Sequence, residues 1–184
     1  MKGIIDTSSL LSLVRYYLPF DKNGKLMAAI QALFASGEII IIDRIIGEAK
    51  YNSKGIVLEK LPFILLQPKL IVKTDNILPN KKFFNCLENQ FCNQVIKRGK
   101  NLNEAEFDVL KNQFVNSADA KMILYALDIS VFNPIIVTEE SSSENDNKLF
   151  KKIPNMCSFI NVDCCTLPIF LRDHCGIDMS DLLS

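Results

Sequence analysis

Short apolar runs alternate along the chain with longer segments in which apolar residues recur every three to four positions. Residues 3–5, 39–42 and 134–138 are such runs, rich in isoleucine and apolar on both faces. Strands that are covered on both sides of a sheet have this pattern, so each run predicts a short buried strand. A further short strand is expected at residues 161–163.

The segments between these runs have the periodicity and the end signals of helices. Residues 7–9 (Thr-Ser-Ser) are available as N-terminal caps for the first of them. The segment 61–72 is apolar but interrupted by two prolines, and it is expected to be irregular or a short helix. Helices are predicted over residues 7–14, 25–35, 43–50, 79–98, 103–114, 117–128, 153–160 and 166–174.

Strands that alternate with helices predict an α/β fold, with three α/β/α layers around a mainly parallel central sheet. The chain of 184 residues contains no internal repeat and no long linker, so a single domain over residues 1–184 is expected. In open parallel sheets, ligands bind at the carboxyl ends of the strands. Functional side chains are therefore expected at that edge.

Acidic residues follow two of the predicted strands. Asp6 comes directly after the first strand, and Glu139 and Glu140 come just past the strand at 134–138. Because the carboxyl ends of parallel strands share one edge, these residues are expected to converge there. Glu48 follows the isoleucine strand by one helical turn and flanks an apolar stripe, so it can lean toward the same edge.

Asp119 is predicted to lie on the core-facing side of the first turn of its helix. It precedes by three, four, seven and eight residues the apolar positions Met122, Ile123, Ala126 and Leu127. An inward-facing carboxylate is costly unless it is paired, hydrogen-bonded or bound to a metal. A structural explanation also exists, in which Ser117 caps the helix and Asp119 complements its dipole. Asp6 could likewise cap the helix that follows it.

The expected convergence of four acidic regions favours a functional interpretation over four separate structural ones. Carboxylates that crowd together repel one another and hold protons more tightly unless a divalent cation lies among them. Oxygen ligands favour Mg²⁺ or Mn²⁺ over zinc. The sequence therefore predicts a site for one of these ions.

The composition narrows the possible functions. Lys and Arg together number 21, as do Asp and Glu, which excludes a strongly polybasic nucleic-acid binder but not a local basic rim. No apolar stretch is long enough to span a membrane, and Asp6 interrupts the apolar start too early for a signal peptide, so a cytoplasmic location is expected. The 6 cysteines include no Cys-x-x-Cys pair and there is 1 histidine, which indicates reduced thiols rather than disulfides or a zinc site.

The acidic positions lie in short motifs whose order resembles that of PIN domains. The motifs are Ile4-Ile5-Asp6-Thr7-Ser8-Ser9, the helical Glu48, Ser117-Ala118-Asp119-Ala120, and Val137-Thr138-Glu139-Glu140. The C-terminal part is similar to a bacterial VapC-like subgroup of this family in the stretches Lys152-Ile153-Pro154-Asn155-Met156-Cys157 and Leu171-Arg172-Asp173. The resemblance extends from residue 3 to about residue 175.

The resemblance implies a Mg²⁺- or Mn²⁺-dependent ribonuclease, commonly the toxin of a toxin–antitoxin pair. It implies RNA as the substrate, a small antitoxin protein as a partner, and homodimerisation, without membrane association. Asp6, Glu48 and Asp119 would be catalytic, metal-binding acids. Glu140 would be the fourth, at the place where PIN domains generally have an aspartate. The alternatives for this fourth ligand are Glu139, Glu144 and Asp146.

The same hypothesis assigns contacts to the substrate. Ser8 or Thr138 would orient a water molecule or a phosphate through its hydroxyl group. Lys148, which follows the fourth acid closely, would contact a phosphate. Lys121 adds a positive charge on the helix of Asp119, whereas residues 97–100 (Lys-Arg-Gly-Lys) are expected to form a solvated surface cluster.

Two other interpretations stay open. One is a catalytically inactive PIN-like module that binds RNA or a protein partner, and the replacement of the usual fourth aspartate favours it. The other is a phosphatase-like hydrolase with Asp6 as a covalent nucleophile. The second is disfavoured because Ser8 stands where that chemistry usually has another acid.

Overall fold

Five short strands form one all-parallel sheet in the computed structural model, which describes residues 1–142 and 147–183. The strands lie in the order β3-β2-β1-β4-β5. The α/β class and the parallel sheet predicted from the sequence are therefore confirmed. The strand bounds are β1 (Gly3–Ile5), β2 (Ile39–Ile42), β3 (Ile71–Val72), β4 (Ile135–Val137) and β5 (Asp163–Cys165).

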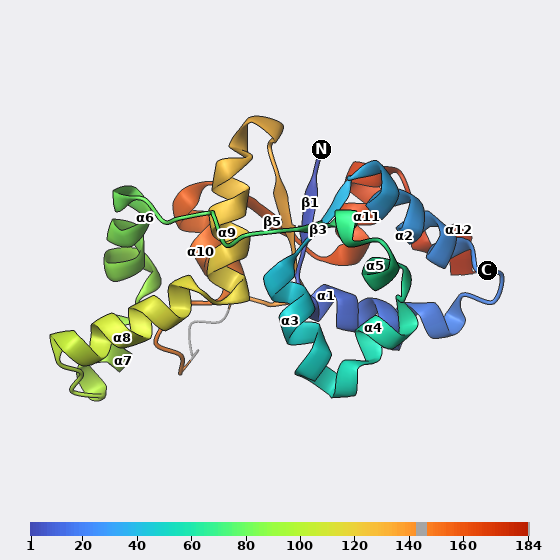
Figure 1. Cartoon of the computed structure of the whole chain (residues 1–184). Helices are drawn as coiled ribbons and strands as arrows, with labels where there is room; N and C mark the ends of the chain where they lie inside the picture. Colours follow the sequence, from blue (N-terminus) through green and yellow to red (C-terminus); the bar gives the residue numbers. More distant parts are fainter. Residues whose placement is uncertain (143–146, 184) are drawn as a thin grey trace.

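The central strand β1 pairs with β2 on one side and β4 on the other. Gly3 is in register with Ile39 of β2 and with Ile135 of β4. Ile4 and Ile5 are fully buried, because helices cover both faces of the sheet (Figure 1). The end of β1 is thus surrounded by protein on all sides except along the sheet edge.

The first half of the chain supplies the helices between β1 and β3. Helix α1 continues through one π-helical turn and one 3₁₀ turn (residues 13–20), and a 3₁₀ turn at residues 52–55 links α3 to α4. The α-helices of this half are α1 (Thr7–Ser12), α2 (Lys25–Ser36), α3 (Asp43–Tyr51), α4 (Ile56–Lys60) and α5 (Phe63–Leu66).

The second half of the chain supplies the helices after β3. A π-helical turn at residues 87–91 extends α6, and a 3₁₀ turn at residues 130–132 leads into β4. The α-helices are α6 (Lys81–Cys86), α7 (Gln94–Gly99), α8 (Glu104–Val115), α9 (Ala118–Asp128), α10 (Ile153–Ile160), α11 (Leu167–Cys175) and α12 (Met179–Leu183).

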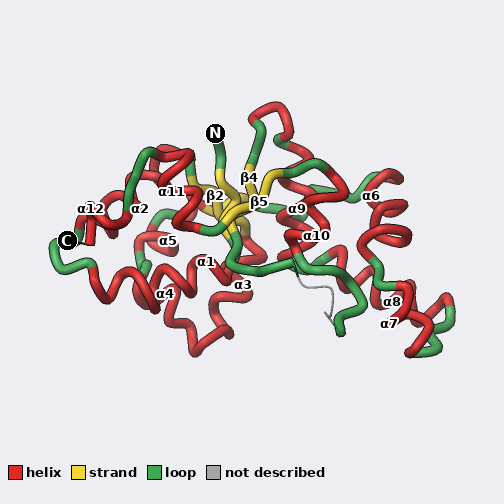
Figure 2. Tube along the Cα trace, turned by 180° about the vertical axis from the view of Figure 1, so that it is seen from behind, coloured by secondary structure: helices red, strands yellow, loops and turns green. Residues whose placement is uncertain are grey.

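The helices form two layers with the sheet between them. Figure 1 shows α6 to α10 on one side of the sheet and α2, α5, α11 and α12 on the other, and the view from behind in Figure 2 shows the same division. The helices α7 and α8 extend farthest from the sheet at one end of the molecule. Right-handed crossovers that run in opposite directions from a central strand give this arrangement.

Several predicted boundaries are wrong for physical reasons. The helix expected over 79–98 is divided, because Cys92 is extended and forms an antiparallel bridge with Phe150, and Asn93 then caps α7. The segment 61–72 ends in β3, a strand of two residues with no pattern of its own. The last strand begins at Asp163 rather than residue 161, because Asn161 is left-handed and ends α10.

The structure also bears on the cysteines and on the possibility of membrane-spanning helices. All six cysteines are free thiols, as expected, although only Cys92 and Cys157 are buried. Among the described residues, no helix combines the length and the apolar character that crossing a membrane requires.

Gly3 provides a test of how α11 packs on the sheet. A Cβ atom at Gly3 would lie 2.4 Å from Cζ of Phe170, a ring that is 1% exposed and confined by the core. Gly3→Ala is expected to lower the free energy of unfolding by about 1–3 kcal/mol, the usual cost of overpacking. Urea denaturation measures this change.

The matched control is Gly47→Ala in α3. Gly47 is exposed and a Cβ there would contact nothing within 4 Å, so alanine is expected to raise the free energy of unfolding by about 0.5–1 kcal/mol. If both substitutions changed stability by the same amount and sign, the close approach of Phe170 to β1 would be contradicted.

Candidate functional site

The candidate site lies where the direction of the sheet topology reverses. Strands β2 and β3 lie on one side of β1, and β4 and β5 lie on the other. Asp6 directly follows β1, and Thr138 directly follows β4. A crevice at the carboxyl ends of two strands whose connections run in opposite directions is the usual ligand site of open α/β sheets. The prediction that functional side chains lie at the carboxyl ends of the strands is therefore consistent with the topology of the sheet.

Asp6 is fixed by three donors. Its Oδ1 accepts from the backbone N of Thr7 at 2.6 Å, which makes Asp6 the N-terminal cap of α1. Its Oδ2 accepts from the hydroxyl groups of Ser8 at 2.6 Å and Thr138 at 2.8 Å. Of the two caps that the sequence offered for this helix, Asp6 is confirmed and residues 7–9 are wrong. Asp6 is 6% exposed, and its three hydrogen bonds hold the carboxylate in one orientation.

Ser8 and Thr138 act on Asp6 in this structure. The Ser8 hydroxyl accepts from the backbone N of Glu139 at 3.0 Å, and the Thr138 hydroxyl accepts from the backbone N of Glu140 at 3.2 Å. Their own hydroxyl protons are therefore available for Asp6. The two residues thus position the aspartate. The sequence-based assignment of one of these hydroxyl groups to a water molecule or a phosphate stays a prediction.

Glu48 reaches the edge from α3. Its Oε2 accepts from the hydroxyl of Thr7 at 2.8 Å. Burial raises the pKa of Glu48, the Thr7 hydrogen bond opposes this, and the charges of Asp6 and Glu140 raise it further. The sequence indicated Thr7 only as a possible helix cap and not as a partner of Glu48, although its position next to Asp6 was the available signal.

Among the four acids, Asp119 has the most strongly raised pKa. It lies half-buried in the first turn of α9, which Ser117 caps by accepting from the backbone N of Ala120 at 3.3 Å. Burial raises the pKa of Asp119 to about 7, and the charges of three other acids add to the effect, namely Asp6, Glu140 and Glu48. The tertiary structure therefore brings together the four acids that the sequence predicted.

Glu139 and Glu140 diverge to the two helix layers. Oε1 of Glu139 accepts from the backbone N of Leu167 at 2.9 Å, at the start of α11. Oε2 of Glu140 accepts from the backbone N of Ile153 at 3.1 Å, at the start of α10. Of the two, Glu140 is the one whose charge acts on Asp119. The other candidates for the fourth acid, Glu144 and Asp146, lie outside the described residues.

The two lysines assigned to this region have different environments. Lys148 is exposed and close enough to Asp119 to oppose the rise in its pKa. Lys121 is 3% exposed and donates to the backbone oxygens of Thr74 at 3.1 Å and Ile77 at 2.8 Å. Lys121 therefore anchors the segment after β3 to α9, and the expectation that its charge is available near the acids is wrong.

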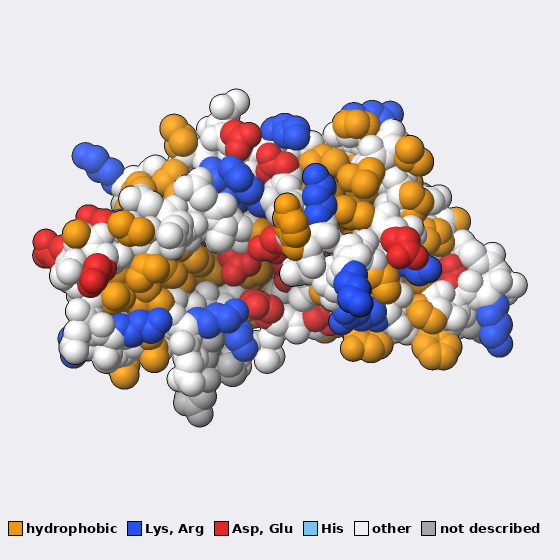
Figure 3. Space-filling view, turned by 60° about the horizontal axis from the view of Figure 1, so that its bottom comes forward, with side chains coloured by type: hydrophobic (Ala, Val, Ile, Leu, Met, Phe, Trp, Pro, Cys, Tyr) orange, Lys and Arg blue, Asp and Glu red, His pale blue; other side chains and the backbone are white. Residues whose placement is uncertain are grey.

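The surface around the site has a distinct charge pattern. Figure 3 shows acidic side chains in the hollow at the centre of this face and Lys or Arg side chains beside them. The chain as a whole is neutral, so the pattern is a local separation of charge. Such a face attracts cations to its centre and anionic groups to its margin.

The donor chemistry fits a hard divalent cation. The four acids offer only carboxylate oxygens, and like charges at such proximity are stabilised by a cation among them. Among the described residues, no three His, Cys, Asp or Glu side chains already stand at the spacing of a metal site. One oxygen of Glu48 accepts from Thr7 and one oxygen of Glu140 accepts from Ile153, so an ion would compete with these bonds or use the second oxygen of each carboxylate.

The comparisons with known proteins give a family but no activity. A family model described as "Domain of unknown function (DUF4411)" matches residues 74–175, more than half of the chain. This region contains α9, β4 and the start of α10, and so contributes Asp119 and Glu140 to the site. No curated protein matches the chain. No solved structure matches it either.

The raised pKa of Asp119 predicts how stability depends on pH when no divalent cation is present. Asp119 binds its proton up to about pH 7 in the folded state but only to about 3.8 when unfolded, so the folded state binds more protons between these values. The contribution of Asp119 to stability is therefore complete below about pH 4 and is lost as the pH rises to about 7. The loss is expected to be about 2–4 kcal/mol, because a half-buried group keeps part of its hydration.

Denaturation in EDTA from pH 4 to 8 measures this effect, with Asp119→Asn as the comparison. The wild type should lose stability relative to Asp119→Asn as the pH rises, and the variant should be the more stable protein at pH 8. A constant difference between the two across this range would mean that burial and the neighbouring acids do not raise the pKa of Asp119.

Proposed function

The chain belongs to the DUF4411 family, whose description leaves its function open, and we propose that it is a divalent-metal-dependent endoribonuclease of PIN-like type. The observation that carries the proposal is the assembly of four acids at one crevice of a parallel sheet, where burial and the charges of the other three raise the pKa of the fourth, Asp119. The all-parallel α/β fold agrees with the architecture that the PIN resemblance implies. Asp6, Glu48, Asp119 and Glu140 would hold Mg²⁺ or Mn²⁺.

The residues at the site suit hydrolysis of a phosphodiester. A bound Mg²⁺ or Mn²⁺ would supply a water molecule of lowered pKa and neutralise charge on the phosphate. Asp6 would keep a fixed orientation, because the Ser8 and Thr138 hydroxyl groups and the Thr7 backbone N hold both of its oxygens. Asp119 would give up its proton on ion binding, since a nearby cation stabilises the carboxylate form.

The remaining groups would orient the substrate. Lys148 offers a positive charge beside Asp119, where it would contact a phosphate of the RNA. The burial of Asp6 and Thr138 excludes water from the back of the site. The crevice would thus present its charged groups to the RNA from the open side only.

The cellular role follows from the VapC-like resemblance alone. We propose that the protein is the cytoplasmic toxin of a toxin–antitoxin pair and that it forms a homodimer. A small antitoxin protein would cover the acidic face and block access to RNA. The acidic centre of that face would suit a basic side chain of such a partner.

A non-catalytic PIN-like module is the second candidate function. Glu140 replaces the aspartate that PIN domains generally have, and one of its oxygens caps α10 through the backbone N of Ile153. If this contact is retained when an ion is present, the fourth acid is only partly available. The protein would then bind RNA or a protein partner without cleaving RNA.

Substitution of the central acids separates these two functions. Asp6→Asn and Asp119→Asn are each expected to reduce Mn²⁺-dependent cleavage of a mixed RNA pool at least about 100-fold, because each removes a carboxylate ligand. The control is Glu59→Gln on the exposed surface of α4, whose carboxylate pairs only with Lys60 in the described structure. Cleavage is followed with and without EDTA, and the cut ends are mapped.

The outcomes are distinct. Wild-type cleavage that needs Mn²⁺ and is lost in both variants supports the ribonuclease. Undiminished cleavage by either variant rejects the assignment of its acid. Mn²⁺-dependent thermal stabilisation without any cleavage by the wild type would favour the non-catalytic module instead.

Thr138 tests whether the orientation of Asp6 matters. Thr138→Val keeps the shape of this buried side chain but removes the hydroxyl that donates to Asp6. Cleavage is expected to fall about 10–100-fold and the Mn²⁺ concentration for half-maximal activity to rise, as for groups that orient a metal ligand. Thr138→Ser restores the hydroxyl and should recover most of the activity. If valine and serine variants behaved alike, the hydroxyl would have no role in positioning Asp6.

A further inference from the structure

A pocket of about 280 Å³ adjoins the acidic site at Asp119. It lies between the residue that follows α7, the corner of α8 and α9, and the segment at residues 147–151. Three lysines line it, namely Lys100, Lys148 and Lys151, together with Asp119. The pocket is therefore a positively charged continuation of a negatively charged crevice.

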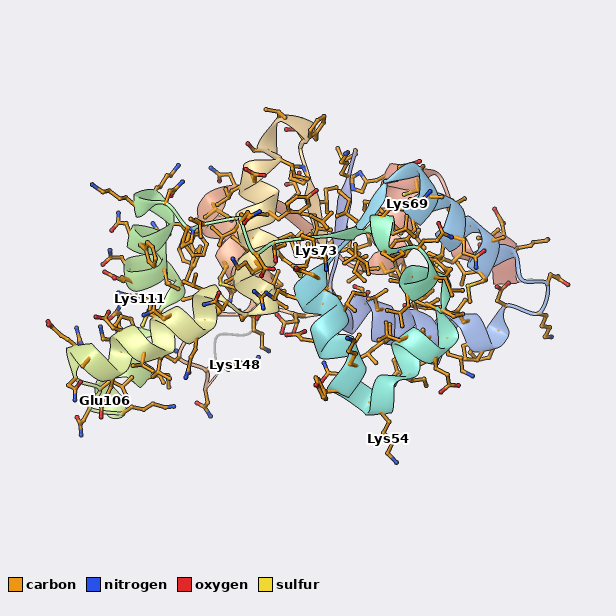
Figure 4. The ribbon with its side chains drawn as sticks, viewed as in Figure 1. Lys54, Lys69, Lys73, Glu106, Lys111 and Lys148 are labelled. Atoms are coloured by element: carbon orange, nitrogen blue, oxygen red, sulfur yellow. The ribbon has the colours of Figure 1, made fainter. Side chains whose placement is uncertain are left out.

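The lysines come from two distant parts of the sequence. Lys148 and Lys151 lie in the segment that leads to α10, and Lys100 lies just after α7. Lys100 and Lys148 are exposed. Lys151 is half-buried, with its Nζ 4.5 Å from the centroid of the Phe159 ring. Figure 4 shows Lys148 below the start of α9, beside the end of α8.

The wall of the pocket is built on fixed backbone. The backbone N of Asn93 donates to the oxygen of Leu149 at 2.8 Å, and the backbone N of Lys151 donates to the oxygen of Phe91 at 2.9 Å. The Phe150 ring stacks on the Phe114 ring of α8 with centroids 4.3 Å apart. These contacts hold the segment at residues 149–151 against the turn that follows α6, the start of α7 and the helix α8.

The basic cluster at residues 97–100 is divided by the fold. Lys97 lies over the Phe107 ring, with its Nζ 3.4 Å from the centroid, in a separate pocket that also contains Glu88 and Asp108. Lys100 instead faces the pocket at Asp119. The expectation of a solvated cluster is confirmed for Lys100, which is exposed, but not for Lys97, which is half-buried over the Phe107 ring. Lys100 also borders the pocket at the margin of the acidic crevice.

We propose that this pocket binds a backbone phosphate of single-stranded RNA next to the bond that is cleaved. The inference rests on the proposed ribonuclease function and adds the strandedness and the path of the substrate. Lysine ammonium groups bind phosphates as point charges without reading sequence. In a neutral chain, three of them around one pocket form a local site for an anionic group.

The size of the pocket favours a single strand over a duplex. A volume of about 280 Å³ is at the small end of ligand pockets and accommodates about one nucleotide. A duplex keeps its bases stacked and paired inside a sugar–phosphate surface and is too broad to enter, whereas an unpaired nucleotide can leave the stack and do so. The strand would pass from the acidic crevice at Asp119 toward Lys100.

Binding of RNA that cannot be cleaved tests the proposal. The probe is a fluorescent single-stranded 2′-O-methyl oligonucleotide, measured by anisotropy in EDTA over a range of salt concentrations. Lys100→Gln is expected to weaken binding about three- to tenfold and to reduce the slope of log K against log salt by about 0.7, the value for one phosphate contact on a single strand. Lys100 is exposed, so the variant is expected to fold normally.

Lys69→Gln is the matched control. Lys69 is also exposed, but it lies beyond the sheet from Lys148 (Figure 4), near residues that precede β1 and β2. Its replacement should leave affinity and salt slope unchanged. Equal affinity and slope for Lys100→Gln and the wild type would overturn the proposal. Equally tight, Lys100-dependent binding of duplex RNA would overturn it too, as would Lys100-dependent binding of polyglutamate but not of RNA.

The result is separable from that of the nuclease assay. Binding of the oligonucleotide that depends on Lys100, without Mn²⁺-dependent cleavage, would reject the ribonuclease and support the pocket as an RNA site. Cleavage by the wild type, together with oligonucleotide binding that does not depend on Lys100, would support the ribonuclease and reject the pocket as an RNA site.

Discussion

The placement of four carboxylates together, partly removed from water, at one edge of the sheet is the constraint on which the rest of the site depends. Burial and the charges of the three other acids together raise the pKa of Asp119 to about 7, close to neutrality. Like charges repel more strongly as water is excluded, so the arrangement requires compensating contacts from the rest of the fold. The structure supplies them from several elements, and the proposed cation would supply the remainder.

The compensating contacts also tie the helices to the sheet. Asp6 accepts from the start of α1 and from Thr138 after β4. Glu139 and Glu140 accept from the first backbone N groups of α11 and α10, on opposite sides of the sheet. Helix N-termini favour negative charge, so these acids stabilise the starts of the helices while the helices stabilise the acids. The geometry of the site and the docking of both layers are therefore coupled.

The lysines near the site fall into two groups, those held by contacts within the protein and those that border the acidic crevice. Lys121 is buried and donates to two backbone oxygens, and Lys97 lies over the Phe107 ring. Lys100 and Lys148 are left to face the margin of the acidic crevice. A neutral chain thus acquires a negative centre with a positive border. This arrangement suits a site that must hold a cation and a phosphate at once.

The sequence by itself determined the α/β class, the strands β1, β2 and β4, and which acids lie near the ends of the strands. These features depend on local patterns of apolar residues and on their spacing along the chain. The edge strands β3 and β5 are half-buried or exposed and have no such pattern, so their bounds depend on pairing with neighbours. Only the tertiary structure decided which groups surround Asp6, that Lys121 is buried, and that Lys100 reaches Asp119's pocket. These are contacts between segments far apart in the chain, and no local pattern encodes the distance between them.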